Sequence, residues 1–235
     1  MRSALLLTVF DRVDLLGPVL EHWRRVPELA DWHLRVAVEP SPAREAVLEA
    51  LRALPDADVV VNEARLGVAE NPYRHLGALF GAGYDFVART EDDLLVSDDV
   101  LRLLEWSAGT FAGEEGIGCV CAFSREPAGA DPSVLRRTAA FTPWLWGTWR
   151  DRWDGVIGPT WDRDYSTWND SPGFESGWDW NLNTRVLPAH GLTTIAPLAS
   201  RVQNIGVVGQ HGTADQHETA ASFLPSFGEV AYRSA

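Results

Sequence analysis

The first 110 residues alternate short apolar runs with longer amphipathic segments, and this alternation restricts the fold more than any other feature of the sequence. The apolar runs cover residues 5–10, 34–38, 58–61 and 85–88. The amphipathic segments cover residues 15–26, 42–54, 71–82 and 98–108. Short apolar runs are typical of buried strands, and apolar residues spaced by three or four are typical of helices. The alternation therefore predicts a parallel sheet with right-handed helical crossovers.

The second half of the chain does not continue this alternation, although the total length of the chain suits a single domain. With 235 residues, 46% of them hydrophobic, the chain is long enough to bury a sizeable core. Strands are predicted at residues 118–123 and 193–196, and a helix after residue 183. We expect one α/β domain, residues 1–235, with its two halves meeting near residue 110.

Three carboxylates, Glu91, Asp92 and Asp93, follow the fourth predicted strand. Open α/β sheets bind ligands at the carboxyl ends of their strands, and Mg²⁺ and Mn²⁺ prefer carboxylate and phosphate oxygens. The cluster therefore indicates a metal–diphosphate site, although an acidic loop that caps the next helix has the same pattern. The chain contains neither G-x-G-x-x-G nor G-x-x-x-x-G-K-[ST], so we expect the metal to hold the phosphates.

The charge and the cysteines narrow the class of protein. A net charge of −13 argues against nucleic acid and anionic membranes as main partners. No apolar run reaches the length of a membrane span, and the run near the N-terminus fits a strand better than a signal peptide.

Cys119 and Cys121 lie two apart on a predicted strand, which is poor spacing for a structural disulfide. We expect reduced core thiols in a cytoplasmic protein.

Eight of the eleven tryptophans lie between residues 141 and 180, separated by aspartates and glycines. An indole ring has a large apolar face and one polar N–H. It therefore suits partly solvent-exposed clefts that bind sugar rings. The alternative is that these rings pack a second, smaller core. We expect about half of them to be structural, and we predict that Trp146, Trp178 and Trp180 contact an acceptor substrate.

Four motifs occur in order: Asp11-Arg12, Glu91-Asp92-Asp93-Leu94, Trp178-Asp179, and Ser200-Arg201 followed by His211-Gly212. In order and approximate spacing they resemble the GT-A glycosyltransferases, and among these the α-mannoside β-1,2-N-acetylglucosaminyltransferase I group. The resemblance implies a GT-A fold and metal-dependent transfer of a hexosyl or N-acetylhexosaminyl group from a nucleotide-diphosphate sugar. The acceptor would be the hydroxyl of a carbohydrate, a glycoconjugate or a small molecule.

The resemblance also implies a metal site and a catalytic base. Asp93 would ligate Mn²⁺ or Mg²⁺, and His211 would assist metal or phosphate binding. Asp179 would be the base of an inverting displacement, which needs one group to take the proton of the acceptor hydroxyl. The alternatives are a helix N-cap for Asp179, an ordinary loop histidine for His211 and a structural ion-pair partner for Arg201.

Further residues would contact the donor. The resemblance places Arg12 at the nucleotide base, Glu39 near the base or ribose, and Glu91 and Asp92 at metal-bound water or donor hydroxyls. Either Arg74 or His75 would provide a further contact to the base.

Two other functions compete with glycosyl transfer. A nucleotidyltransferase that makes nucleotide sugars usually carries a glycine-rich basic loop after its first strand, whereas residues 10–14 contain no glycine. A non-catalytic carbohydrate-binding protein would explain the tryptophans, but not the acidic cluster at the end of a strand. Glycosyl transfer accounts for both features.

Overall fold

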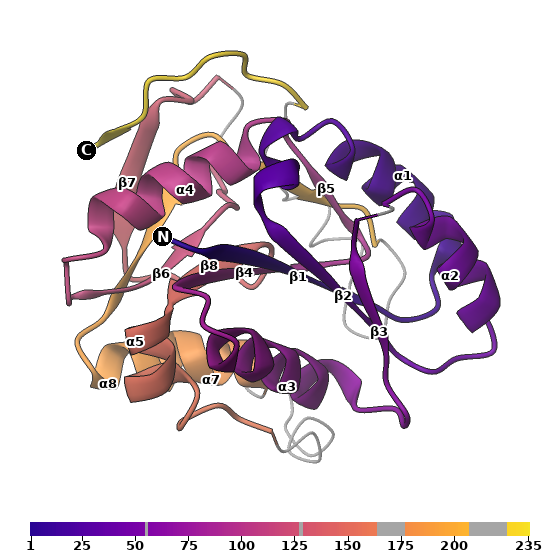
Figure 1. The fold of residues 1–235 in the computed structure, drawn as a ribbon. Helices are drawn as coiled ribbons and strands as arrows, with labels where there is room; N and C mark the ends of the chain where they lie inside the picture. Colours follow the sequence, from indigo (N-terminus) through magenta and orange to yellow (C-terminus); the bar gives the residue numbers. More distant parts are fainter. Residues whose placement is uncertain (55, 127–128, 164–176, 207–224) are drawn as a thin grey trace.

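The computed structural model describes residues 1–54, 56–126, 129–163, 177–206 and 225–235. These residues form a nine-stranded sheet with helices on both faces (Figure 1). In spatial order its strands are β11 (Arg233–Ser234), β7 (Val134–Thr138), β9 (Thr193–Pro197), β6 (Ile117–Cys121), β8 (Trp146–Trp149), β4 (Phe86–Glu91), β1 (Ser3–Val9), β2 (His33–Val38) and β3 (Asp58–Val61).

The predicted parallel sheet is confirmed for the first half of the chain. Strands β3, β2, β1 and β4 are parallel neighbours. They are connected through α1 (Val13–Trp23), the short 3₁₀ helix η1 (Pro27–Asp31), α2 (Arg44–Leu51) and α3 (Gly67–Gly81). Each element lies within a few residues of its predicted position. However, β4 extends to Glu91, so Glu91 belongs to the strand and only Asp92 and Asp93 lie in the turn after it.

The second half completes the same sheet with mixed strand directions. Strand β8 lies antiparallel between β4 and β6, β9 is parallel to β6, and β7 is antiparallel to β9. Two further strands, β5 (Leu94–Val96) and β10 (Val202–Asn204), pair as a separate antiparallel ribbon. The ribbon strand β5 separates the acidic turn from α4 (Val100–Phe111), where the sequence predicted that the helix would follow directly.

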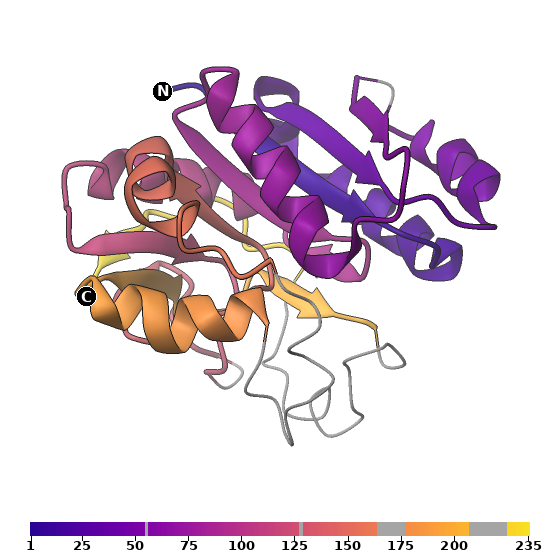
Figure 2. The same cartoon turned by 90° about the horizontal axis from the view of Figure 1, so that it is seen from below.

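Two layers of helices bury the two faces of the sheet. One face carries α1, α2 and α4. The other, seen from the front in Figure 2, carries α3, the helical segment formed by α5 (Arg150–Arg152) and η2 (Trp153–Ile157), and the segment formed by α7 (Trp178–Asn181), η3 (Leu182–Val186) and α8 (Leu187–Ala189). Cys119 and Cys121 are free and buried on this second face, as expected. Within the described residues, no helix combines the length and hydropathy needed to cross a bilayer.

Candidate functional site

The predicted acidic cluster lies where the carboxyl ends of β1, β2 and β4 meet. These strands are parallel and adjacent, so the residues that end or follow them gather at one edge of the sheet. Arg12 follows β1, Glu39 follows β2, and Glu91 is the last residue of β4. Asp92 and Asp93 form the turn between β4 and β5. The fold thus brings together five of the residues that the sequence analysis assigned to the donor and metal.

Arg12 joins the two aspartates of this turn. Its guanidinium nitrogens Nη2 and Nη1 lie 2.6 Å from Asp92 Oδ1 and 2.9 Å from Asp93 Oδ2. The other oxygen of Asp92, Oδ2, accepts the backbone N–H of Phe10 at 2.9 Å. Burial raises the pKa of Asp92, and the charge and hydrogen bonds of Arg12 oppose that rise. Both oxygens of Asp92 are therefore already occupied by the protein.

Asp93 differs from Asp92 because one of its oxygens is uncommitted. Asp93 Oδ1 is buried and has no hydrogen-bond partner among the described residues. Burial, with the neighbouring charge of Glu91, raises the pKa of Asp93 to about 6. Mg²⁺ in proteins is commonly held by one or two carboxylates together with substrate phosphates. Asp93 therefore fits a phosphate-bound cation as its single carboxylate ligand.

The rest of a metal shell would not come from the described side chains. Among the described residues, no group of three or more His, Cys, Asp or Glu side chains is placed to hold a metal ion. His211, the second ligand expected from the sequence, lies outside the described residues. Among the described side chains, Asp93 is the ligand that a bound ion would have, and a substrate would add oxygens of its own.

The segment after β10 closes the site over Asp93. The N–H of Ile205 donates to the Asp93 carbonyl at 2.8 Å, and the N–H of Gly206 donates to Asn204 Oδ1 at 2.7 Å. A Cβ atom at Gly206 would lie 2.4 Å from Asp93 Oδ2 and 2.9 Å from Arg12 Nη1. Only glycine allows the backbone to pass so close to the ion pair. In the sequence analysis this segment lies between Ser200-Arg201 and His211-Gly212, and Gly206 was given no role.

Glu39 organises the loop that leads into α3. Its Oε2 and Oε1 accept the backbone N–H groups of Leu66 and Gly67 at 2.9 and 2.8 Å. Gly67 has a φ of +82°, in the left-handed region that favours glycine. Because both carboxylate oxygens bind this turn, Glu39 shapes the rim of the site, and its contact with a nucleotide remains a proposal.

His75 is held in the same part of the structure. Its Nε2 lies 3.0 Å from Asn62 Oδ1, and the amide nitrogen of Asn62 donates to Asn71 Oδ1 at 3.1 Å. Since a carbonyl oxygen only accepts, this network assigns the proton of the histidine to Nε2. Burial lowers the pKa of His75 and favours the neutral ring. Arg74, the alternative base contact, is exposed and pairs with Glu70 at 2.6 Å.

Asp179 lies beside the charged end of β4. The N-cap of α7 is Gly177, so Asp179 is not the N-cap of this helix. Burial raises the pKa of the Asp179 carboxyl, hydrogen bonds from the backbone N–H groups of Trp180 and Asp179 oppose the rise, and Glu91 adds to it. Arg89, two residues before Glu91 on β4, acts in the opposite direction. The sequence analysis missed Arg89 because it stands in a run that otherwise fits a buried strand.

Two of the three tryptophans predicted to contact an acceptor lie in the core. Trp146 and Trp178 are 1% and 3% exposed. The ring of Trp178 stacks on Trp161 with centroids 4.6 Å apart and on Trp146 with centroids 6.0 Å apart. Both therefore follow the packing alternative. Trp180 is half-buried, and for this residue the acceptor contact stays a proposal.

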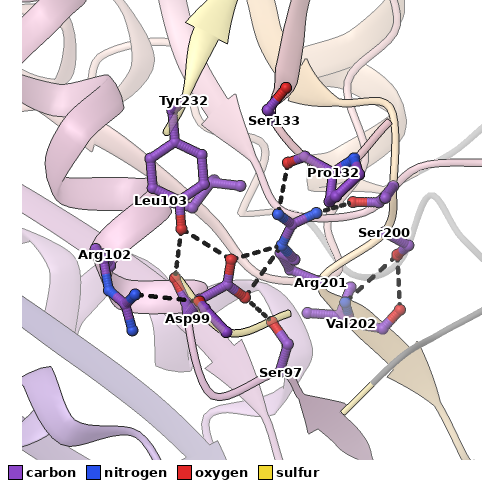
Figure 3. A network of polar contacts seen from close by, with 12 residues as sticks. Ser97, Asp99, Arg102, Leu103, Pro132, Ser133, Ser200, Arg201, Val202 and Tyr232 are labelled. Carbon is purple, nitrogen blue, oxygen red and sulfur yellow. Dashed lines mark hydrogen bonds and ion pairs between the residues drawn. The ribbon is translucent and has the colours of Figure 1, made fainter. Parts of the chain in front are cut away.

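Arg201 belongs to a buried polar network away from the acidic turn (Figure 3). Its Nε lies 3.0 Å from Asp99 Oδ2, and both side chains are fully buried. Its Nη1 and Nη2 donate to the carbonyls of Ala199 and Pro132 at 2.6 and 2.7 Å. The hydroxyl of Tyr232 donates to Asp99 Oδ2 at 2.8 Å. Arg201 is thus a structural ion-pair partner.

Comparison with known proteins supports the fold. No protein-family model matches the sequence, and no curated protein sequence matches it. Several solved structures are similar, among them the following three. TarS of S. aureus has a TM-score of 0.56 and 10% identity, over 88% of this chain and 61% of that chain. A candidate nucleotide-diphospho-sugar transferase of Desulfovibrio desulfuricans G20 has a TM-score of 0.51 and 12% identity, over 83% of this chain and 80% of that chain.

The third structure is a mycobacterial protein with a TM-score of 0.51 and 16% identity, over 86% of this chain and 67% of that chain. The chain has the GT-A fold, that of the nucleotide-diphospho-sugar transferases. At these identities the likeness establishes the fold alone. The GT-A fold agrees with the resemblance drawn from the four sequence motifs, without singling out the α-mannoside transferase group within it.

In this GT-A fold, the site combines three chemical groups. Asp93 offers one uncommitted carboxylate oxygen. Arg12 provides a cation that stays charged, because the carboxylates of Asp92 and Asp93 outweigh the effect of burial and raise its pKa. Asp179 of α7 is half-buried and provides a second carboxyl, whose pKa is influenced by the charge of Glu91 at the end of β4. The arrangement is suited to binding an anionic group at one end and to accepting a proton at the other.

Proposed function

We propose that the protein transfers a sugar from a nucleoside-diphosphate sugar to an acceptor hydroxyl. The observation that carries this proposal is the acidic turn at the end of β4 in a GT-A fold, where the charge of Glu91 acts on the Asp179 carboxyl of α7. The solved structures support the fold, and the site chemistry supports the reaction class. The finer assignment, hexosyl or N-acetylhexosaminyl transfer, rests on the motif resemblance.

The donor would bind at the carboxyl ends of β1, β2 and β4. Asp93 Oδ1 would hold Mn²⁺ or Mg²⁺, and the ion when bound would neutralise charge on the leaving diphosphate. Arg12, which already bridges Asp92 and Asp93, would keep their carboxylates oriented and would contact the nucleotide base. Glu39 and His75 would border the nucleotide through the loop that they hold.

Asp179 would act as the general base. In an inverting displacement, the acceptor oxygen forms a bond to the anomeric carbon while the bond from that carbon to the diphosphate oxygen breaks, and the hydroxyl proton passes to the base. A raised carboxyl pKa suits this role because it brings the group nearer to the operating pH. Trp180, the next residue and half-buried, would flank the acceptor.

Calorimetric titration with UDP, GDP and TDP, each with and without Mn²⁺, tests the donor site. We expect one nucleotide to bind with metal-dependent affinity. The matching nucleoside monophosphate is the control, and it should bind more weakly because it lacks the phosphate that bridges to the ion. Absence of binding by all three nucleotides would overturn the proposal and leave carbohydrate binding as the function to examine.

The Asp179→Asn variant tests the base. Asparagine is nearly isosteric but cannot accept a proton, so we expect donor-nucleotide affinity to stay within about twofold while kcat falls roughly 10²- to 10⁴-fold. The measurement is initial-rate transfer or donor hydrolysis with the nucleotide sugar whose nucleotide binds. Turnover at the wild-type rate would remove Asp179 from the mechanism.

A further inference from the structure

Arg65 is an exposed cation beside the acidic turn. It lies in the loop between β3 and α3, and its guanidinium carbon lies 4.3 Å from the ring centroid of Phe10. Phe10 follows β1 directly, is half-buried and donates its backbone N–H to Asp92 Oδ2 at 2.9 Å. The contact with Phe10 therefore brings the guanidinium of Arg65 to the end of β1, next to the residues that the proposed function assigns to the donor.

The loop that carries Arg65 is held at both of its ends. At the start of the loop, the N–H of Asn62 donates to the last residue of β2 at 2.9 Å. At its end, the two residues after Arg65 donate their N–H groups to the Glu39 carboxylate at 2.9 and 2.8 Å. Since Glu39 follows β2, both ends are fixed to the same strand. A ligand that contacts Arg65 would therefore have little of this loop to order on binding.

Arg65 differs from Arg12 because its guanidinium is not committed to a carboxylate. Both terminal nitrogens of Arg12 already hold aspartates. Among the described residues, no hydrogen bond or ion pair engages Arg65, although Glu63 lies in the same loop. The ring of Phe10 covers one side of the guanidinium, and the exposed side chain leaves its other side and its N–H groups open to a ligand.

The order of the strands indicates which part of a donor would reach Arg65. Along this edge of the sheet the order is β4, β1, β2 and β3. The proposed function places the diphosphate at Asp93, after β4, and the nucleoside toward Glu39, after β2. Neighbouring strands are about 4.8 Å apart, so a nucleoside in this direction would pass the end of β1, where Arg65 lies on Phe10. Nucleobases stack on aromatic rings and on the planes of arginine guanidinium groups.

We propose that Arg65 binds the nucleobase of the donor by stacking, with the ring of Phe10 holding the guanidinium in place. The base would lie on the side of the guanidinium that Phe10 leaves open. This inference rests on the proposed function, because it names the residue that binds one part of the proposed donor. Every nucleobase has a π face, so the contact would give affinity for the base without selecting among bases.

The test compares Arg65→Ala and Arg65→Lys with the wild type by calorimetry in the presence of Mn²⁺. The two probes are inorganic pyrophosphate and the nucleotide, among UDP, GDP and TDP, that the wild type binds. Alanine removes the guanidinium, whereas lysine keeps the positive charge but has no planar face. We expect the Kd of the nucleotide to rise roughly 5- to 100-fold in both variants, the range typical of a lost base-stacking contact. The Kd of pyrophosphate, which has no base, should stay within about twofold of the wild-type value.

Arg24→Ala is the matched control. Arg24 is also exposed, forms no ion pair among the described residues, and follows α1, about 18 Å along the helix axis from Arg12. This variant removes the same charge away from the site, so it should leave both affinities unchanged. A fall in nucleotide affinity as large as that of Arg65→Ala would mean that overall charge, and not stacking, sets the affinity, and would overturn the inference.

The remaining outcomes separate stacking from other contacts. Nucleotide affinity that Arg65→Lys keeps and Arg65→Ala loses would show a charge contact and overturn the stacking. Equal losses of pyrophosphate and nucleotide affinity would assign Arg65 to the phosphates and overturn it as well. Wild-type nucleotide affinity in both variants would overturn the inference and leave the proposed function intact. Failure of the wild type to bind any of the three nucleotides would refute the proposed function, and the inference with it.

Discussion

At the scale of single residues, Gly206 is the position where the packing of the site permits the least change. A Cβ there would lie 2.4 Å from Asp93 Oδ2, so Gly206→Ala must displace either the Asp93 carboxylate or the chain after β10. We expect metal-dependent nucleotide affinity to fall roughly tenfold or more, because small displacements of a binding group are costly. Calorimetry with the nucleotide that the wild type binds measures the effect.

Gly109 provides the matched control for Gly206. It lies in α4, and a Cβ there would meet nothing within 4 Å. Gly109→Ala should raise the free energy of unfolding by up to about 1 kcal/mol, as expected for a helix interior, and leave nucleotide affinity unchanged. If Gly206→Ala bound nucleotide as tightly as Gly109→Ala, the close approach of this backbone would have no part in binding.

Asp93 and Asp92 should respond differently to the same substitution. Asp93→Asn removes the carboxylate that has an uncommitted oxygen, so we expect metal-dependent nucleotide affinity to be lost. Its melting temperature should not fall, since Arg12 keeps its pair with Asp92 and a desolvated charge is removed. Asp92→Asn breaks an ion pair and alters the acceptor for the Phe10 N–H, so its melting temperature should fall.

Differential scanning fluorimetry and calorimetry on the two aspartate variants separate these effects. Nucleotide binding by Asp93→Asn that still depends on Mn²⁺ would refute the assignment of Asp93 as the metal ligand. Equal melting temperatures for the two variants would mean that the protein contacts of Asp92 contribute little to stability.

The residues of the site differ in how far the sequence revealed them. Arg12, Asp92 and Asp93 follow apolar runs of strand length, and adjacent parallel strands bring such positions to one edge. Arg65 and Gly206 carry no comparable signal. Their importance depends on contacts made by the folded chain, with Phe10 for Arg65 and with Asp93 for Gly206.

At the scale of secondary-structure elements, the buried Arg201–Asp99 pair joins the start of α4 to β10 and to the C-terminal segment of Tyr232. Arg201→Met would leave Asp99 as a buried, poorly compensated charge. We expect the free energy of unfolding to fall by about 3–5 kcal/mol. Urea denaturation measures this value. Arg233→Met is the control, because it breaks only an exposed pair with Asp131 and should give no measurable change.

Equal denaturation midpoints for these two variants would show that the Arg201–Asp99 pair does not stabilise the fold.

The Arg201–Asp99 network also explains why the Ser200-Arg201 motif of the sequence is partly structural. Arg201 fixes the start of β10, and three residues later the chain reaches Asn204, which precedes the contact with Asp93. A motif arginine can therefore support a site without touching it.

The elements themselves were predictable where local pattern and pairing agree. The β1–β4 units have apolar runs of strand length followed by helical periodicity, so local propensity and tertiary structure point to the same answer. The strands missed by the sequence analysis are β5, β7, β8, β10 and β11, which have only two to five residues each. Such strands exist because of partners far away in the sequence, and β8 (Trp146–Trp149) is defined by pairing with β4 and β6.

At the scale of the whole molecule, one sheet connects the two halves of the chain. The predicted division near residue 110 does not separate two cores, because β8 from the second half lies between β4 and β6. The residues of β1 alternate between the two hydrophobic clusters, with Leu5 and Leu7 in one and Leu6 in the other. Loss of either helix layer would therefore expose the sheet that supports the other.

This shared sheet predicts a single cooperative unfolding transition. Tryptophans report on both faces, since Trp23 and Trp32 lie in the cluster under α1, α2 and α4, whereas Trp146 and Trp178 lie in the opposite cluster. In guanidinium denaturation, the midpoints from tryptophan fluorescence and from far-ultraviolet circular dichroism should coincide. A fragment of residues 1–112 should not fold alone, because β4 would lose β8 as its neighbour and expose an unpaired apolar edge. Two separate transitions, or a folded and soluble 1–112 fragment, would show that the halves are independent domains.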